Sequence, residues 1–400
     1  MQTRLKTFVT AVGMACLGLG ALHAQAQDKV KIGFITDMSS LYADVEGKNG
    51  ALAIQMAIDD FGGKVLGKPI ELLTADHQNK ADLAATKARE WIDTQELTML
   101  FGGTTSSTAL AMAKVAQEKK RVFIVNGAGS SALTNEQCTP YTVHYAYDTV
   151  ALARGTGSAV VKNGGKSWFF LTADYAFGHA LEADTSKVVK DSGGEVIGSV
   201  RHPIGASDFS SFLLQAQNSK AQVLGLANAG GDTQNAIKAA KEFGIAKTMK
   251  VVGLLVFVTD VHSLGLKNTE GLLLTSSWDW NLNDKTRAFG KKFFEKTKRM
   301  PTDLQAADYS ATMNYLKAVQ AAGTVDADAV MAKLKSTPLD DFYAKGVIRP
   351  DGRYAHDMYL MQVKSPKEST QPWDYYKVVS RLPADEVWTK KSETKCPLWK

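Results

Sequence analysis

The stretch from Leu97 to Val125, LTMLFGGTTSSTALAMAKVAQEKKRVFIV, carries the pattern that decides the fold. It opens with an apolar run at 97–101 and closes with another at 122–125, and each has the length of a strand. Between them, 108–118 shows the apolar spacing of a helix, and a Gly/Thr/Ser tract at 102–108 precedes that helix. A strand, a helix and a second strand in this order predict two parallel strands with the helix packed against them.

The same alternation extends outward from this stretch. It covers residues 30–125, restarts at 149 and runs to 255, while the chain after Trp278 is richer in helix. Two similar runs predict an α/β fold with two lobes of like architecture, each a parallel sheet covered by helices. The expected strands are 30–36, 70–75, 97–101, 122–125, 167–172, 196–200, 223–227, 250–255, 346–349 and 358–363. The expected helices are 50–61, 81–94, 108–118, 149–162, 175–191, 209–218, 233–243, 285–298, 304–322 and 327–334.

The amino terminus has the three parts of a secretory signal. Arg4 and Lys6 precede an apolar stretch at 8–22, and Ala24-Gln25-Ala26 offers a cleavage site before Gln27. We therefore expect residues 1–26 to be a cleavable signal peptide and the mature protein to be exported to the periplasm. Cys16 raises the alternative of a lipid anchor, but Gly13-Met14-Ala15 lacks the large aliphatic residue expected three positions upstream.

Charge and hydropathy exclude two classes of partner for the mature chain. Removal of Arg4 and Lys6 with the signal lowers the number of basic residues from 47 to 45, while the number of acidic residues stays at 41. The formal net charge therefore falls from +6 to +4. This excess is scattered, with no basic run, and nucleic acid is a poor candidate. No segment after the signal has the apolar length of a membrane span, so we expect no membrane insertion of the mature chain.

Cleavage leaves two of the three cysteines, Cys138 and Cys396. An even pair in an exported chain predicts a disulfide. The alternative, two unpaired buried thiols, is less favourable in an oxidising compartment.

The hydroxyl-rich tract at 102–108 is a candidate anion site. Backbone N–H groups and the helix dipole at a helix start attract negative charge, and Thr105 and Ser106 lie there. Ordinary helix capping is the alternative, although one hydroxyl would suffice for it. We favour ligand contact because five hydroxyl residues follow two glycines.

The turn after the next strand, Asn126 to Ala132, contains G-x-G-x-x-A, which raises a dinucleotide-binding enzyme as an alternative. The following segment, 134–140, is a polar loop with a proline instead of the helix that such a site needs. Glycines here instead let backbone amides approach a ligand. The chain shows no nucleophile elbow, no H-E-x-x-H and no spaced Cys/His set, so we predict no enzyme activity, no cofactor and no metal.

Aromatic residues follow strands in both halves of the chain. They are Tyr42, Tyr175, Phe177, Trp278 and Trp280. Core packing is as good an explanation as ligand contact for any one ring. Together they favour a pocket, because loops at the carboxyl ends of strands bind ligands in open α/β sheets.

These residues resemble one family: the periplasmic binding proteins of the leucine/isoleucine/valine-binding type, which serve ABC transporters. The resemblance runs from about Val30 to about Val363. Its marks, specific in their order, are Lys31-Ile32-Gly33-Phe34, the tract at 102–108, Asn126-Gly127-Ala128-Gly129, Asp174-Tyr175-Ala176-Phe177-Gly178 and Gln305-Ala306-Ala307-Asp308-Tyr309.

The resemblance implies a type I fold: two Rossmann-like lobes with parallel sheets, joined by three hinge crossovers near Asp148, Ser276 and Asp351. Lobe 1 would comprise 28–148 and 277–350, and lobe 2 would comprise 149–276 and 351–400. A ligand would be enclosed between them. The residues implied to contact it are Tyr42, Thr105, Ser106, Ala128, Gly129, Ser130, Tyr175, Phe177, Asn228, Leu254 and Trp278.

One departure from the family pattern bears on the ligand. Amino-acid binders of this family use an acidic residue of the second lobe to pair the ligand's ammonium group, but here 252–257 is apolar. A buried ammonium without a partner is costly. Asp232 could substitute, although a helix-capping role explains it more simply. We therefore predict a carboxylate ligand with an apolar or aromatic body and no amine.

The predicted function is the extracytoplasmic solute-binding component of an ABC importer, acting as a monomer that docks on a membrane permease. Three alternatives remain. The chain could bind a branched-chain amino acid or amide, or be a ligand-sensing module that docks on a membrane receptor. A nicotinamide-dependent enzyme is the most distant.

Overall fold

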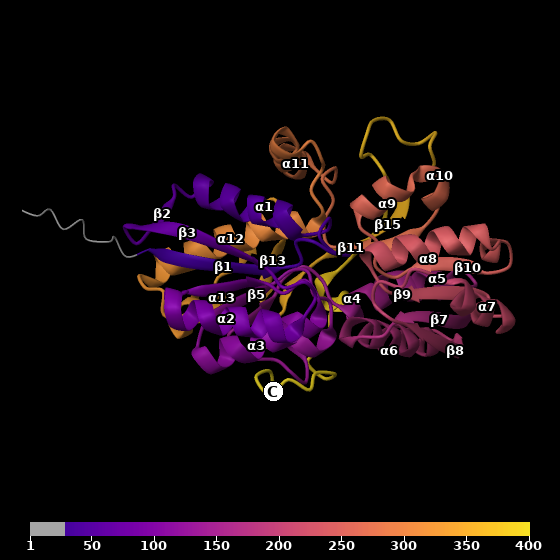
Figure 1. Cartoon of the computed structure of the whole chain (residues 1–400), viewed down its shortest axis with the longest axis horizontal. Helices are drawn as coiled ribbons and strands as arrows, with labels where there is room; N and C mark the ends of the chain where they lie inside the picture. The colour runs from indigo at the N-terminus through magenta and orange to yellow at the C-terminus, as the bar shows by residue number, and fades with distance from the viewer. Residues whose placement is uncertain (1–28) are drawn as a thin grey trace, which may run out of the picture.

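The computed structural model describes residues 29–400 and consists of two α/β lobes side by side (Figure 1). The predicted signal peptide and Cys16 lie outside the described residues. Within 29–400, no helix combines the length and the apolar character needed to span a bilayer. The predicted fold class is confirmed: each lobe has its own sheet with parallel strands and helices on its faces.

The sheet of the first lobe has the order β2-β3-β1-β4-β5-β6. Its strands are parallel except for the antiparallel pair β2–β3. Side chains alternate between the two faces of this sheet. On one face, Phe34 and Phe101 pack toward helices α1 and α12. On the other face, Ile35 and Leu100 pack toward helices α2 and α3. The elements are β1 (Val30–Thr36), α1 (Gly47–Asp60), β2 (Lys64–Val65), β3 (Lys68–Asp76), α2 (Ala81–Gln95), β4 (Met99–Gly102), α3 (Ser106–Lys119), β5 (Val122–Val125), β6 (Thr142–His144), α12 (Asp303–Ala322) and α13 (Ala327–Ser336).

The sheet of the second lobe has the order β10-β9-β7-β8, with every pair parallel. Its elements are β7 (Ser167–Ala173), α6 (Ala176–Asp191), β8 (Glu195–His202), α7 (Ser210–Asn218), β9 (Val223–Ala227), α8 (Gly230–Glu242), β10 (Lys250–Gly253), α9 (Val258–Leu264) and α10 (Leu266–Thr269). The expected strand 250–255 therefore ends at Gly253.

The helix expected at 149–162 is interrupted. It consists of α4 (Thr149–Leu152), a π-helical turn at Ala153–Gly157 and α5 (Ser158–Lys162). Gly155 in this turn lies against β11, where a Cβ would come within 2.2 Å of Oγ1 of Thr275. The widened turn and the missing side chain thus bring this helix close to a strand that lies more than a hundred residues later.

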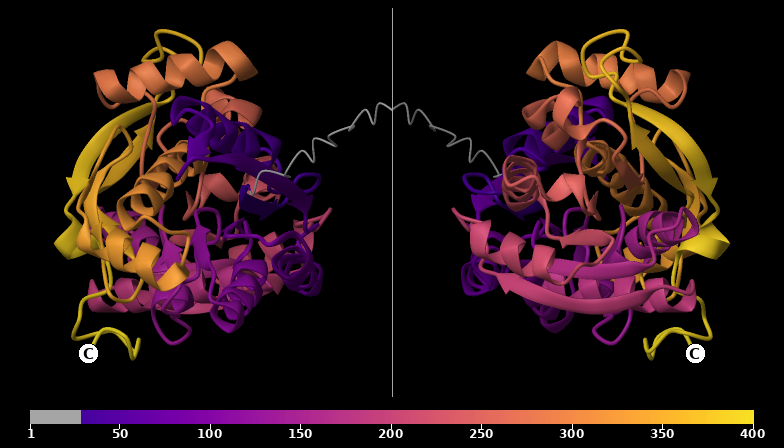
Figure 2. Two further views of the ribbon diagram at one scale, coloured as in Figure 1. Left: turned by 90° about the vertical axis from the view of Figure 1, so that its left-hand side faces the viewer. Right: turned by 90° about the vertical axis from the view of Figure 1, so that its right-hand side faces the viewer.

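Two small antiparallel sheets complete the fold. One contains β11 (Leu273–Ser276), β15 (Met358–Val363) and β16 (Tyr376–Leu382), and the other contains β12 (Leu339–Asp340), β13 (Lys345–Ile348) and β14 (Tyr354–His356). β14 pairs with β13, and Arg353 just before β14 bridges to His144 of β6 in the first lobe. The remaining helices are α11 (Asp284–Thr297) and α14 (Ala384–Val387). Figure 2 shows the long strands of the C-terminal region along one side of the molecule, with the C-terminal tail at the end opposite α11.

The predicted disulfide is confirmed. Cys138 and Cys396 are bonded across 258 positions, with their Cα atoms 5.8 Å apart. The tail also contacts the other lobe, since Arg154 in the interrupted helix forms an ion pair with Glu393 at 2.7 Å. The C-terminal tail is therefore attached to both lobes.

Candidate ligand-binding cleft

A small cavity lies between the lobes. Every residue of its wall follows the carboxyl end of a parallel strand of one lobe or the other, which is where open α/β sheets bind ligands. The wall consists of Tyr42, Val45, Thr104, Ser106, Gly127, Gly129 and Tyr147 from the first lobe and Tyr175, Phe177, Ala229, Leu255 and Phe257 from the second.

The first lobe contributes the start of a helix. Ser106 is the first residue of α3, and its Oγ accepts a hydrogen bond from the backbone N–H of Ser130 at 3.0 Å. Two glycines make the turn before this helix: Gly102 has a φ of +105°, and a Cβ there would lie 2.4 Å from the carbonyl oxygen of Ile35. The sharp turn therefore brings the N–H groups of the first helical turn to the cavity, where they lack intrahelical partners.

The glycine turn after β5 keeps the cavity open. A Cβ on Gly129 would lie 2.7 Å from the ring of Tyr147 and 2.8 Å from the ring of Phe177. A Cβ on Gly127 would lie 2.9 Å from Cα of Thr104. Tyr147 is held in place because its hydroxyl donates to the carbonyl of Gly127 at 2.6 Å.

Helix starts from the second lobe also meet the cavity. Tyr175 precedes α6 and Phe177 lies in its first turn, while Ala229 and Phe257 precede α8 and α9. None of α3, α6 and α8 has a side-chain cap at its start. Helix starts carry partial positive charge, so this arrangement favours an anionic group in the ligand.

Five aromatic rings give the wall an apolar character; they are Tyr42, Tyr147, Tyr175, Phe177 and Phe257. The ring centroids of Tyr175 and Phe177 lie 6.0 Å apart, and those of Tyr147 and Phe257 lie 6.4 Å apart. The hydroxyls of Tyr42 and Tyr175 lie 2.9 Å apart and join the two lobes. Burial is the main cause that raises the pKa of both hydroxyls, so they remain protonated.

The nearby acidic side chains lie behind the wall. Glu46 accepts hydrogen bonds from the hydroxyls of Thr36 at 2.6 Å and Thr104 at 2.5 Å, and burial raises its pKa. Asp232, which could have replaced the family's acidic residue, accepts from the N–H of Gly205 at 3.1 Å with both carboxylate oxygens. Among the described residues that form the wall, none carries an acidic or a basic side chain.

The wall contains five of the eleven residues that the sequence predicted for ligand contact: Tyr42, Ser106, Gly129, Tyr175 and Phe177. Six others lie outside it. The hydroxyl of Thr105 bonds to that of Thr108 at 3.0 Å, and the hydroxyl of Ser130 accepts from the N–H of Ala132 at 3.4 Å. The carbonyl of Ala128 is bonded to Nε2 of His144 at 2.6 Å.

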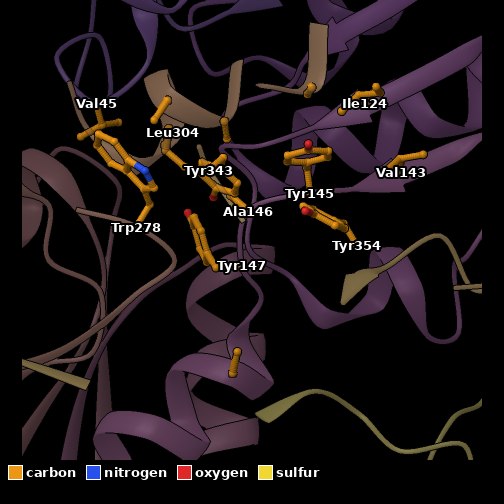
Figure 3. Packing of buried hydrophobic residues seen from close by; sticks show 14 of the residues in the cluster. Val45, Ile124, Val143, Tyr145, Ala146, Tyr147, Trp278, Leu304, Tyr343 and Tyr354 are labelled. Carbon is orange, nitrogen blue, oxygen red and sulfur yellow. The ribbon is translucent and has the colours of Figure 1, made fainter. Parts of the chain in front are cut away.

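The remaining three of these six have partners inside the protein. Asn228 accepts from Oγ1 of Thr233 at 2.7 Å and contacts a histidine ring with its amide nitrogen, while Leu254 is fully buried. Trp278 donates its indole N–H to the carbonyl of Phe342 at 3.3 Å. Figure 3 shows its ring beside Val45, within the buried cluster that includes Tyr343 and Leu304.

Seven wall residues were missed: Val45, Thr104, Gly127, Tyr147, Ala229, Leu255 and Phe257. Four of them are immediate neighbours of a predicted residue, so the sequence located the loop but not the side of the chain that faces the cavity. Tyr147 and Phe257 carried a usable signal, because each is an aromatic residue a few positions after a strand.

Comparisons with known proteins agree with this architecture. A family model described as periplasmic binding protein matches residues 29–370. A periplasmic binding protein from Burkholderia mallei is 68% identical, with a TM-score of 0.93 over 93% of this chain and 100% of that one. A branched chain amino acid ABC transporter periplasmic ligand-binding protein from Burkholderia xenovorans LB400 is 39% identical, with a TM-score of 0.83 over 93% of this chain and 100% of that one.

A more distant structure shares the fold. It is a solute binding protein of an ABC transporter from Rhodopseudomonas palustris BisB5, solved in complex with 3,4-dihydroxy benzoic acid. It is 24% identical, with a TM-score of 0.81 over 90% of this chain and 98% of that one. The family model covers most of the chain, and the two-lobed fold with an interlobe cavity accords with it. The chain therefore belongs to the family of periplasmic binding proteins.

Proposed function

We propose that this protein is the solute-binding component of an ABC importer and that it captures a small carboxylate with an apolar or aromatic body in the interlobe cavity. The single observation that carries the ligand class is the composition of the wall. Helix starts and five aromatic rings surround the cavity, and its described residues include no acidic side chain to pair an ammonium group. A carboxylate is stabilised by such a wall, whereas a buried unpaired ammonium is destabilised by several kcal/mol.

Ser106 and the first turn of α3 are the proposed carboxylate site, with Gly129 allowing the approach. Tyr42, Tyr175 and Phe177 would enclose the body of the ligand. The lobes would close by hinge motion at three crossovers, near Asp148, Ser276 and Asp351. The finer parts of the proposal are export through a cleavable signal at 1–26, action in the periplasm as a monomer, and docking of the closed lobes on a permease.

A branched-chain amino acid is the second candidate ligand. The observation that favours it is the description of the Burkholderia xenovorans relative, at 39% identity, as belonging to a branched chain amino acid transporter. Asp232 would then have to give up its bonds to Gly205 to reach an ammonium group.

Calorimetric titration of the mature protein with acids and amino acids separates the two candidates. The panel is benzoate, phenylpropenoate, 3-methylbutanoate, leucine and valine. We expect one or more of the acids to bind at least about tenfold more tightly than leucine, which corresponds to about 1.4 kcal/mol. Tight binding of leucine with no response to the acids would falsify the proposal.

A further inference from the structure

The bond between Tyr42 and Tyr175 leaves one hydrogen atom without an acceptor. The two hydroxyl oxygens lie 2.9 Å apart, and either can be the donor. Two hydroxyl groups carry two hydrogens, and a single bond between them uses one. Within residues 29–400, neither hydroxyl has a further hydrogen-bond partner.

Two polar groups of the surrounding protein have hydrogen-bond partners other than this pair. Tyr147 uses its own hydroxyl hydrogen on the carbonyl of Gly127 at 2.6 Å. The carboxylate of Asp232 accepts from the backbone N–H of Gly205 with both oxygens. Both Tyr42 and Tyr175 form part of the cavity wall, so a ligand in the cavity can offer an acceptor to the second hydrogen.

Tyr42 is the buried member of the pair, whereas Tyr175 is half-buried. Tyr42 is 4% exposed, and its ring packs on the backbone of the second lobe, where a Cβ on Gly230 would lie 3.1 Å from it. Gly230 has a φ of +56°, a conformation that favours glycine and allows this close approach. A buried donor without an acceptor destabilises the closed state.

We infer that the ligand carries a second oxygen, in addition to its carboxylate, and that this oxygen accepts a hydrogen bond from the Tyr42–Tyr175 pair. The inference rests on the proposed function, because it takes the carboxylate to lie at the start of α3. The chemical class is an acid whose apolar or aromatic body bears a hydroxyl, ether or carbonyl oxygen. An acid of the same size with a methyl group at that position leaves the hydrogen unpaired and binds at least about tenfold more weakly.

The test compares matched pairs of acids by calorimetric titration of the mature protein. The pairs are 3- and 4-hydroxybenzoate against 3- and 4-methylbenzoate, and 4-hydroxyphenylpropenoate against 4-methylphenylpropenoate. We expect the wild type to favour the hydroxy acid in at least one pair by about tenfold or more. The double variant Tyr42→Phe/Tyr175→Phe lacks both hydrogens, so this preference should fall to about threefold or less.

Tyr309→Phe is the matched control. Its hydroxyl donates to Oδ2 of Asp60 at 2.6 Å on the surface of the first lobe, so the preference should remain as in the wild type. Equal binding of both members of every pair by the wild type would overturn the inference. An equal loss of affinity for the hydroxy acid and the methyl acid in the double variant would also overturn it, because that result places the carboxylate itself at the tyrosines. If none of the acids binds, the proposed function fails first and the inference fails with it.

Discussion

Arg353 and Asp148 form an ion pair that is buried inside the protein, with Nη2 of the arginine 3.2 Å from Oδ2 of the aspartate. Asp148 lies at the first predicted crossover, and Arg353 lies in the segment before β14 that leads to the third. Arg353 also donates to the carbonyl of Tyr147 at 3.2 Å, and its guanidinium stacks on the ring of Trp388. The pair therefore links the wall residue Tyr147 to two of the predicted crossovers.

Removing one member of this pair should destabilise the protein strongly. Arg353→Met leaves Asp148 buried without its cation, and we expect the free energy of unfolding to fall by about 3–5 kcal/mol. Adding Asp148→Asn should restore part of the loss, which chemical denaturation of both single variants and the double variant would measure. The exposed pair Lys187–Asp191 is the control, with an expected coupling of at most about 1 kcal/mol. Similar coupling energies for the two pairs would contradict the prediction that burial strengthens the coupling between Arg353 and Asp148.

Ser106→Ala should weaken binding of the acid found by titration by about fivefold to tenfold, because it removes a polar group from the proposed carboxylate site. The matched control is Ser107→Ala, one position along the same helix and outside the cavity wall. We expect the control to bind as the wild type does. Equal effects of the two substitutions would place the carboxylate elsewhere.

Gly129→Ala should block the closed state. The added Cβ would meet the rings of Tyr147 and Phe177 at 2.7 and 2.8 Å, and these rings come from different lobes. Since φ at Gly129 is not in the left-handed region, the backbone itself tolerates alanine. We expect affinity to fall by at least about tenfold, with a small change in the melting temperature of the ligand-free protein. Unchanged affinity would show that the cavity wall yields at this point.

Asp303, the first residue of α12, should make stability depend on pH. Burial raises the pKa of this carboxyl from 3.8 to about 6, although the hydroxyl of Ser277 donates to it at 2.9 Å. In the folded state the carboxyl holds its proton to higher pH than in the unfolded state. The contribution of Asp303 to the free energy of unfolding therefore decreases as pH rises from about 4 to about 6. At about 1.36 kcal/mol per pKa unit, the decrease is up to roughly 3 kcal/mol.

Asp303→Asn should remove this dependence. The free energy of unfolding of the variant minus that of the wild type should be larger at about pH 8 than at about pH 4, by on the order of 1–3 kcal/mol. Denaturation at both pH values measures it. The exposed residue Asp385 supplies the control variant, Asp385→Asn, for which we expect no such change. If the free energies of unfolding of Asp303→Asn and the wild type differ by the same amount at the two pH values, titration of Asp303 does not cause the pH dependence.

Loss of the Cys138–Cys396 disulfide should lower stability without abolishing binding. The bond closes a loop of 258 positions, and its removal from the chain typically costs about 2–5 kcal/mol. Neither cysteine belongs to the cavity wall. The double variant Cys138→Ser/Cys396→Ser should therefore unfold at lower denaturant concentration and keep its affinity. A large loss of affinity would instead show that the tail helps to hold the lobes together.

The sequence by itself determined most of the alternation of strands and helices in the two lobes. Local apolar periodicity and the glycine-hydroxyl turn at 102–108 carried that information, and the strand Val30–Thr36 has the predicted bounds. The parity of the cysteines likewise predicted the disulfide. β11 and β16 are among the strands that were not predicted, because they are stabilised by pairing with β15 and not by their own pattern.

Only the tertiary structure decided which side chains face the ligand cavity. Ser106 and Thr105 are neighbours of the same chemical type, yet one belongs to the wall and the other bonds within its own helix. Likewise, Gly129 borders the cavity because Tyr147 and Phe177 approach it from the two lobes. Such contacts join residues distant in sequence, and their direction depends on how the two lobes close. Local residue patterns cannot specify that direction, since it is set by packing between the lobes.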